Sequence, residues 1–466
     1  MKRKIFSIIS LILLLVLTLS LTGCGTSKTT APVEEDAVEI KLWARSFEDY
    51  ADNLLMKQVA EFNKDLTDGV QVSLHFYGDD NTYDTAIAAG QENGTVAEVY
   101  MAQYDRIITY HKAGYILPIG DYLSDEIKAG YIESIKEDVT YKDPADGEWK
   151  MYAMPWYVEP SMMLYYDKAK LREAGVTEIP TTQTGLLEMC AKVSKVMKAN
   201  LNQYTLIVPT TSVELTWTTF GLLENFTGGQ VVDESWKNSR LDMAEAQFKE
   251  CASLFYELSK NNYSPIASLT PEGYVDGIDA VCDGKAAMAL CGSWGIGRIM
   301  NYYPEIADNI GIAAMPGRYN TTGTSCNGGW TYVVSSKCSE EKAQAAAKFL
   351  TWYLCKVENA CQTFEASFYA KGPTRTDVKE YLNTHAKGVN PDWVALVNEV
   401  SSQGVMPPGT SWSVSVQMGS LFEYMLNHAK EGKNFDTLYR EKIVEVKDTI
   451  ESITSQSGYV TNPKLK

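Results

Sequence analysis

The strongest constraint on the fold of this chain is an alternation of strand patterns with helix patterns that begins at residue 38. Residues 38–42 alternate apolar and polar side chains, which is the period of two of a strand. Apolar side chains in 55–66 recur at spacings of four, three and four, as on one face of a helix. Residues 70–76 alternate again, and a helix-like stretch at 83–91 and a short strand-like run at 97–101 follow. This order predicts an α/β domain with a largely parallel sheet.

Polar and aromatic side chains stand where these predicted strands end. Trp43 and Arg45 follow the first strand, Asp80 follows the second, and Tyr104 and Asp105 follow the third. In parallel α/β sheets, ligands bind beyond the carboxyl ends of the strands. We therefore expect these five residues at a ligand site, although Trp43 is also suited to covering the sheet.

The N-terminus predicts export from the cell. Three basic residues precede an apolar run at 5–21, which is the layout of a signal peptide. The run ends in Leu21-Thr-Gly-Cys24, which resembles the motif that bacterial lipoprotein signal peptidase reads. We expect residues 1–23 to be removed, Cys24 to carry a diacylglyceryl group, and residues 24–37 to form a flexible tether. A plain signal peptide and an uncleaved anchor are the alternatives. The lipid anchor predicts the extracellular face of a membrane, of the Gram-positive type.

Size and charge narrow the class of protein. Without the predicted signal peptide and tether, roughly 430 residues remain, which suits two domains better than one. The formal net charge of −17 disfavours nucleic acid and anionic ligands. The 10 Trp and 28 Tyr residues leave material for an aromatic binding surface beyond ordinary packing.

The eight cysteines besides Cys24 form no Cys-x-x-Cys pair and no Cys/His cluster, so a zinc site is not expected. Their scatter through predicted helices and strands suits buried free thiols better than a disulfide framework.

Motifs that carry catalysis or bind cofactors are missing from the sequence. There are four histidines, and none of the common zinc-protease, P-loop or serine-hydrolase motifs is present. The glycine-rich segment Gly292–Gly297 lacks the spacing of a dinucleotide loop, and Asp79 with Asp80 lacks the calcium-loop pattern. We therefore expect no cofactor, no metal and no enzyme activity. A glycosidase with Asp105 and Glu159 as its two carboxylates is the enzymatic alternative.

Four segments, in order along the chain, resemble the family of extracellular solute-binding proteins of sugar ABC importers, the group that contains maltose-binding protein. The segment 103–118 has an aspartate-bearing loop, a helix and a Gly…Leu-Pro turn, and 152–175 resembles the family's G-x-P…Y-N-K…A-G block. Residues 283–294 resemble its G-K-A-A-M…G-S-W block, and 328–334 begin with Gly-Gly-Trp. The chain departs from the family pattern at Ala97-Glu-Val, where Pro-Asp-Val is usual, and at Asp167, where asparagine is usual.

The resemblance implies the type II periplasmic-binding-protein fold, in which two α/β lobes are joined by crossing strands and the ligand lies in the cleft between them. It implies crossings near 153–157, 313–317 and 366–371. The first lobe would then comprise residues 38–155 and 314–366, and the second would comprise residues 156–313 and 367–466. Closure of the lobes on a ligand that contacts both would shift the population toward the closed form.

The resemblance also implies ligand-binding residues. Aromatic rings that stack on sugars are expected from the family positions, and carboxylates are expected to accept hydrogen bonds from hydroxyls. The aromatic candidates are Trp294, Trp330 and Trp412, and the carboxylates are Glu159 and Asp105. Further candidates are Tyr157, Trp217, Asp80 and Arg375, the last with a lobe interface as its alternative role.

The sequence therefore predicts a substrate-binding lipoprotein that captures a carbohydrate, an oligosaccharide because several aromatics line the expected cleft. Its partners would be the transmembrane subunits of an ABC importer, and it would act as a monomer. A receptor for a peptide, polyamine or osmolyte is the alternative within binding proteins.

Overall fold

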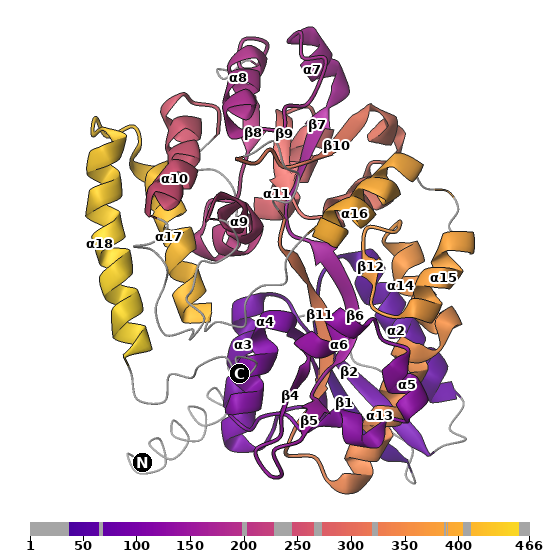
Figure 1. The fold of residues 1–466 in the computed structure, drawn as a ribbon. Coiled ribbons are helices and arrows are strands. Elements are labelled where there is room, and N and C mark those ends of the chain that lie inside the picture. Colours follow the sequence, from indigo (N-terminus) through magenta and orange to yellow (C-terminus); the bar gives the residue numbers. More distant parts are fainter. Residues whose placement is uncertain are drawn as a thin grey trace, which may run out of the picture.

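The computed structural model describes residues 37–64, 69–197, 203–227, 245–264, 273–318, 325–385, 388, 390–403 and 412–455, and its chain forms two lobes, each built on its own sheet (Figure 1). The predicted signal peptide, Cys24 and the tether up to residue 36 lie outside the described residues. Within the described part, no helix is both long and apolar enough to cross a membrane.

The first lobe contains a six-stranded sheet with the order β12-β6-β11-β3-β1-β2. The first three strands of the chain pair in parallel, β1 with both β2 and β3, as the alternation of patterns predicted. β11 runs antiparallel between β3 and β6. The strands are β1 (Val38–Arg45), β2 (Val70–Tyr77), β3 (Val99–Gln103), β6 (Met154–Pro160), β11 (Asn327–Val334) and β12 (Gly372–Pro373).

Helices cover both faces of this sheet, and local capping explains where two of them begin. Asp79 accepts a hydrogen bond from the backbone of Thr82 at the start of α3, and Ser339 caps α13 through Lys342 in the same way. The longer helices are α2 (Asp49–Lys64), α3 (Asp80–Asn93), α4 (Tyr104–Lys112), α13 (Glu340–Cys355), α14 (Val357–Ala366) and α15 (Thr376–His385). The shorter elements are η2 (Ile119–Tyr122), α5 (Asp125–Ala129), α6 (Glu133–Asp138), and the hairpin β4 (Thr140–Lys142) and β5 (Trp149–Met151).

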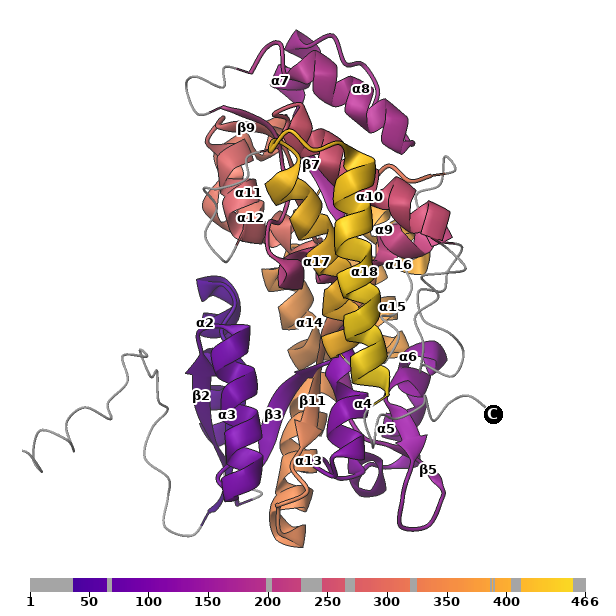
Figure 2. The same cartoon turned by 90° about the vertical axis from the view of Figure 1, so that its left-hand side faces the viewer.

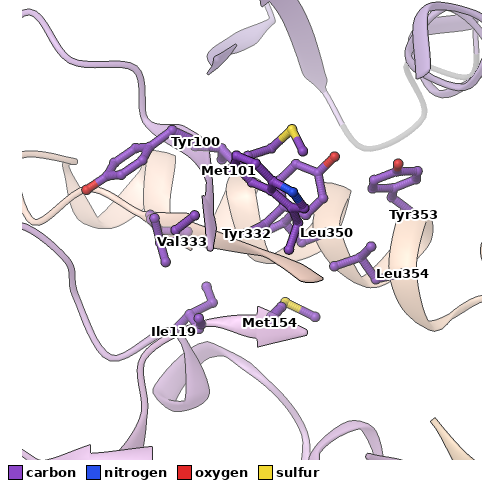
Figure 3. Close-up of a cluster of buried hydrophobic side chains, with 14 of the residues drawn as sticks. Tyr100, Met101, Ile119, Met154, Tyr332, Val333, Leu350, Tyr353 and Leu354 are labelled. Carbon is purple, nitrogen blue, oxygen red and sulfur yellow. The ribbon is translucent and has the colours of Figure 1, made fainter. Parts of the chain in front are cut away.

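The core of the first lobe lies where β3 and β11 meet α13 (Figure 3). Tyr332 pairs with Met101 across the two strands, and α13 contributes Leu350 and Tyr353 to the same cluster. All eight residues of β11 are buried. A central strand covered on both faces needs apolar or small residues at every position, so β11 shows no period of two.

The second lobe contains a four-stranded sheet with the order β10-β7-β9-β8. Alternate residues point to opposite faces, so Leu164 and Leu290 join one core and Tyr165 and Cys291 the other. Its strands are β7 (Met163–Asp167), β8 (Tyr204–Ile207), β9 (Ala286–Cys291) and β10 (Ile310–Ala314). The first core includes side chains of α8 (Gln183–Val193), α9 (Ser212–Thr227), α10 (Glu245–Lys260), α17 (Trp412–His428) and α18 (Phe435–Thr454). The second includes side chains of α11 (Gly273–Cys282), α12 (Trp294–Tyr302), η4 (Pro304–Asn309) and α16 (Pro391–Gln403), and α7 (Lys168–Glu173) follows β7.

The chain passes between the lobes at positions that differ from the sequence-based boundaries. β6 stays in the first sheet up to Pro160, so the first crossing lies at 160–163 and not at 153–157. Cys326 still belongs to a second-lobe core, so the first lobe resumes near residue 327 and not at 314. β12 pairs with β6 and α15 contributes to the first core, so residues 372–385 belong to the first lobe. Pairing and packing partners, which the local pattern does not carry, set these boundaries.

The eight cysteines of the described residues form no disulfide with one another, and most of them are buried. Burial raises the pKa of the Cys190 thiol and of the Cys361 thiol, each to about 12. These thiols are therefore protonated at neutral pH and poorly reactive.

Candidate functional site

The carboxyl ends of β1, β2 and β3 bring charged side chains together in the first lobe. Arg45, the last residue of β1, places its Nε 2.8 Å from Oδ1 of Asp80, the first residue of α3. Arg106, in the first turn of α4, lies 3.4 Å from Asp84 and 3.4 Å from Asp105. The strand-end rule thus placed Arg45, Asp80 and Asp105 at one edge of the sheet.

A small pocket opens beside these ion pairs. Its wall combines the Trp330 and Tyr83 rings with the charged groups of Asp80, Asp84 and Arg106, and the remaining lining residues are Ala102, Gln103 and Tyr110. Burial raises the pKa of the Asp84 carboxyl, and the nearby Arg106 guanidinium only partly offsets that effect. The pocket is therefore lined by paired charges and aromatic rings.

Asp105 does not line this pocket, although it pairs with Arg106 beside it. The carboxyl is 6% exposed, and burial raises its pKa despite the Arg106 charge. Its Oδ1 accepts no hydrogen bond from the described residues.

Phe47, which was not predicted from the sequence, covers Trp330. Trp330 is only 7% exposed, whereas Phe47 is 39% exposed. The two rings meet edge to face, with their centroids 5.1 Å apart and their planes at 75°. Arg45 lies with its guanidinium carbon 5.9 Å from the Phe47 centroid. The exposed aromatic surface at this edge therefore belongs to Phe47, and Trp330 supports it from behind.

A second group of side chains lies on the crossing strand β6. Lys371 Nζ is 2.6 Å from Glu159 Oε2 and 3.9 Å from the centre of the Tyr157 ring. The Lys371 and Glu159 side chains are 11% and 8% exposed, so the charges are mutually compensated where little water reaches them. Burial, the largest cause, and the Glu159 charge both raise the pKa of the Tyr157 phenol well above its usual value.

Two tryptophans of the second lobe lie against glycines next to this crossing. Trp217 of α9 is half-buried, and its ring occupies the space that a Cβ on Gly328 would need. Gly328 pairs with Glu159 across β11 and β6, so Trp217 reaches the strand beside Glu159. Trp294, the first residue of α12, lies against Gly292 in the same way. The next residue after Gly292, Ser293, donates its backbone N–H to Pro160 O of β6 at 2.9 Å.

The structure does not bring all of the predicted residues to these groups. Arg375 is 5% exposed inside the first lobe, where it donates to both oxygens of Asp377 and to Ile127 O. These contacts, together with its place over the Tyr131 ring, make Arg375 part of the packing of the lobe.

Tyr104 is buried in the core of the first lobe, and Trp43 packs edge-on against Tyr77, which agrees with the alternative that Trp43 covers the sheet. Trp412, another predicted ligand contact, is the first residue of α17. Its side chain and residues 404–411 are not among the parts of the chain that the structure describes.

Phe47 and Lys371 were not predicted from the sequence. Phe47 comes two residues after the end of β1, so the strand-end rule that selected Arg45 could have included it. Lys371 falls within the predicted third crossing, but only its contact with Glu159 distinguishes it from other lysines.

Comparison with known proteins finds a match to the family model described as "Bacterial extracellular solute-binding protein" over residues 46–356. A curated relative, the maltotriose-binding protein of Pyrococcus abyssi (strain GE5 / Orsay), is 24% identical over 237 residues. That alignment covers 51% of this chain and 45% of the relative, so the chain spans about half the length of the curated protein that it matches.

Solved structures share the fold over most of the chain. The GacH receptor of Streptomyces glaucescens, studied unliganded and with acarbose, has a TM-score of 0.70 and 18% identity, covering 89% of this chain and 99% of that one. A solute-binding protein of Thermotoga lettingae bound with α-D-tagatose has a TM-score of 0.70 and 21% identity, covering 88% and 99%. The maltotriose-binding protein of Thermus thermophilus, bound with maltotriose, has a TM-score of 0.68 and 19% identity, covering 88% and 100%.

Proposed function

This chain belongs to the family of bacterial extracellular solute-binding proteins, and from that premise we propose that it binds an uncharged oligosaccharide between its lobes for an ABC importer. The relatives solved with acarbose, α-D-tagatose and maltotriose support a sugar as the class of ligand.

One observation carries the proposal. The carboxylates at the edge of the first-lobe sheet and on the crossing strand β6 are each paired with a cation of the same chain. Asp80 is paired with Arg45, Asp84 and Asp105 share Arg106, and Glu159 is paired with Lys371. A receptor for a cationic solute such as a polyamine needs carboxylates without such partners, and a receptor for an anion needs unpaired cations. Paired groups keep spare acceptor and donor positions for hydroxyl groups, which suits a neutral polyhydroxylated ligand.

Aromatic surfaces support the same class of ligand. Phe47 presents an exposed ring beside the polar pocket, and Trp217 and Trp294 lie near the crossing from the other lobe. Flat rings next to hydrogen-bonding groups match the apolar faces and hydroxyl edges of pyranoses.

The paired carboxylates also argue against the glycosidase alternative. Glu159 Oε2 already accepts from Lys371 Nζ at 2.6 Å, so a cation of the chain occupies the position from which a general acid would protonate a glycosidic oxygen. Asp105 is fixed by Arg106 and does not line the pocket. We propose that Glu159 serves binding, that Asp105 holds Arg106 in place, and that neither carboxylate serves hydrolysis.

The proposed location and partners follow from the predicted N-terminal signal peptide with its lipidation motif, and from the family. Processing before Cys24 would anchor the chain by lipid to the outer face of a membrane of the Gram-positive type, as a monomer. The tether at 24–37 would let the folded part reach the transmembrane subunits of the importer.

The test is a titration of the mature chain, followed by tryptophan fluorescence, with neutral oligosaccharides, a polyamine, a peptide and an osmolyte. A saturable response to at least one neutral oligosaccharide, with none to the other solutes, is expected. Response to a charged solute or a peptide alone would overturn the proposal. Chromatography of the same glycans after incubation must return them unchanged, and released sugar would establish the glycosidase instead.

A further inference from the structure

The glycine-rich segment of the second lobe, Gly292–Gly297, has a structural use that nucleotide binding does not explain. A Cβ on Gly295 would lie 2.8 Å from Cζ of Tyr165, a residue of the same lobe. A Cβ on Gly297 would overlap the hydroxyl of Tyr50, which belongs to α2 of the first lobe. Gly297 therefore permits α12 to approach the start of α2 closely, across the two lobes.

The residue after Gly297 extends this contact with an ion pair between the lobes. Arg298 Nη1 donates to Glu48 Oε2 of the first lobe at 2.8 Å. The other edge of the guanidinium is held within the second lobe, where Nε and Nη2 donate to the two oxygens of Asp279 at 2.9 and 2.7 Å. Figure 2 shows α11 and α12, which carry Asp279 and Arg298, above the upper end of α2.

Two further contacts surround this ion pair. The Arg298 guanidinium lies 4.4 Å from the centre of the Tyr302 ring, and Asn301 Nδ2 donates to Ala366 O at the end of α14 at 3.4 Å. One face of α12 thus meets both α2 and α14 of the first lobe. Every atom of this contact belongs to the chain itself.

Arg298 is the cation that lies between two carboxylates, Glu48 of the first lobe and Asp279 of the second. The side chains of Arg298, Glu48 and Asp279 are 21%, 18% and 27% exposed, so solvent screens them only in part. Burial raises the pKa of Glu48, the Arg298 charge lowers it, and the Asp279 charge raises it further. Without Arg298, two carboxylates from different lobes would face each other and repel.

We propose that Arg298 is a positioning residue that joins the lobes through Glu48 and so holds a fraction of unliganded molecules closed. Opening of the lobes breaks the bond to Glu48, while Asp279 keeps the guanidinium in place for reclosure. The pair therefore adjusts the equilibrium between open and closed forms. This inference rests on the hinge closure of the proposed function but not on the identity of the ligand.

The test is small-angle X-ray scattering of the mature chain without ligand. Arg298→Gln is expected to raise the radius of gyration, because the repulsion between Glu48 and Asp279 then favours the open form. Adding Glu48→Gln removes that repulsion and is expected to reverse at least half of the increase. Arg440→Gln, an exposed arginine of α18 in the same lobe, is the matched control and is expected to leave the radius unchanged.

A second pair of variants tests the same contact without changing charge. Gly297→Ala is expected to raise the radius by displacing the Tyr50 hydroxyl, and Gly297→Ala with Tyr50→Phe is expected to lower it again. Near-ultraviolet circular dichroism of each variant separates opening from unfolding. An unchanged radius in both Arg298→Gln and Gly297→Ala would overturn the proposal, as would an increase that neither second substitution reverses. The scattering uses no sugar, so failure of the carbohydrate proposal leaves this result readable.

Discussion

The two lobes bring different chemistry to the region between them. The first lobe contributes charged groups that are already paired, as in Arg45 with Asp80 and Arg106 with Asp84. The second lobe contributes the rings of Trp217 and Trp294, each seated on a glycine backbone. The difference is one of degree, because the first lobe also has the exposed Phe47 ring and the second also has the Arg298–Asp279 pair. The proposed sugar would contact groups of both lobes and would therefore bind the closed form better.

The largest expected effect comes from removing the space that seats Trp217. Gly328→Val would force the Trp217 ring away from β11 and overpack a fully buried strand, and we expect a loss of about 3 kcal/mol or more in the free energy of unfolding. Urea unfolding measures this loss. Gly78→Val, at a position with open space around it, is the control. Equal stabilities for the two variants would contradict the close seating of the ring.

The next effect concerns the pair on the crossing strand. Lys371→Met would leave Glu159 as a buried, unpaired charge, and we expect the free energy of unfolding to fall by about 2–3 kcal/mol. The double variant with Glu159→Gln should recover most of that loss. Urea unfolding of the single and double variants checks this, and additive losses would show that the two charges are not coupled.

Replacing Phe47 tests whether the exposed ring of the first lobe contacts the ligand. Phe47→Ala removes an exposed ring, so we expect stability within about 0.5 kcal/mol of the parent but about tenfold weaker binding of the best oligosaccharide found by titration. Trp149→Ala, another exposed aromatic of the first lobe, should leave affinity unchanged. If Phe47→Ala binds as well as the parent, the exposed ring is not a ligand contact.

The smallest effect is a pH dependence of the first lobe. Burial raises the pKa of Asp105 above its ordinary value of 3.8, so the folded chain holds this proton to higher pH than the unfolded chain does. The contribution of Asp105 to stability is therefore most favourable below the ordinary pKa and declines as pH rises through the raised one. Relative to Asp105→Asn, the parent should lose unfolding free energy with rising pH in that window. Urea unfolding across the acidic range measures it, with the exposed Asp125→Asn as control. A difference that is flat with pH would contradict the raised pKa.

The strand-end rule predicted correctly that polar residues from three strands share one edge of the first sheet, because the rule depends only on chain order; their role in ligand binding stays a prediction. Parallel strands end at the same edge of a sheet, so Arg45, Asp80 and Asp105 lie near one another regardless of how the surrounding helices pack. The same rule selected Tyr104, whose side chain turns into the core, because strand order does not say which way a side chain points. Arg375 was misplaced because its Asp377 and Ile127 partners were not recognised.

The local sequence was sufficient for the α/β alternation, the parallel pairing of the first three strands and the polar edge at their ends, since these depend on periodicity and on neighbours along the chain. The cation partners of the carboxylates near the crossing and between the lobes depend on tertiary structure. Lys371 and Glu159 are separated by 212 residues, and Arg298 and Glu48 by 250. Such pairs form only when strands and helices from both lobes pack together. The relative exposure of Phe47 and Trp330 has the same origin, because burial is a property of the packed chain and not of either residue.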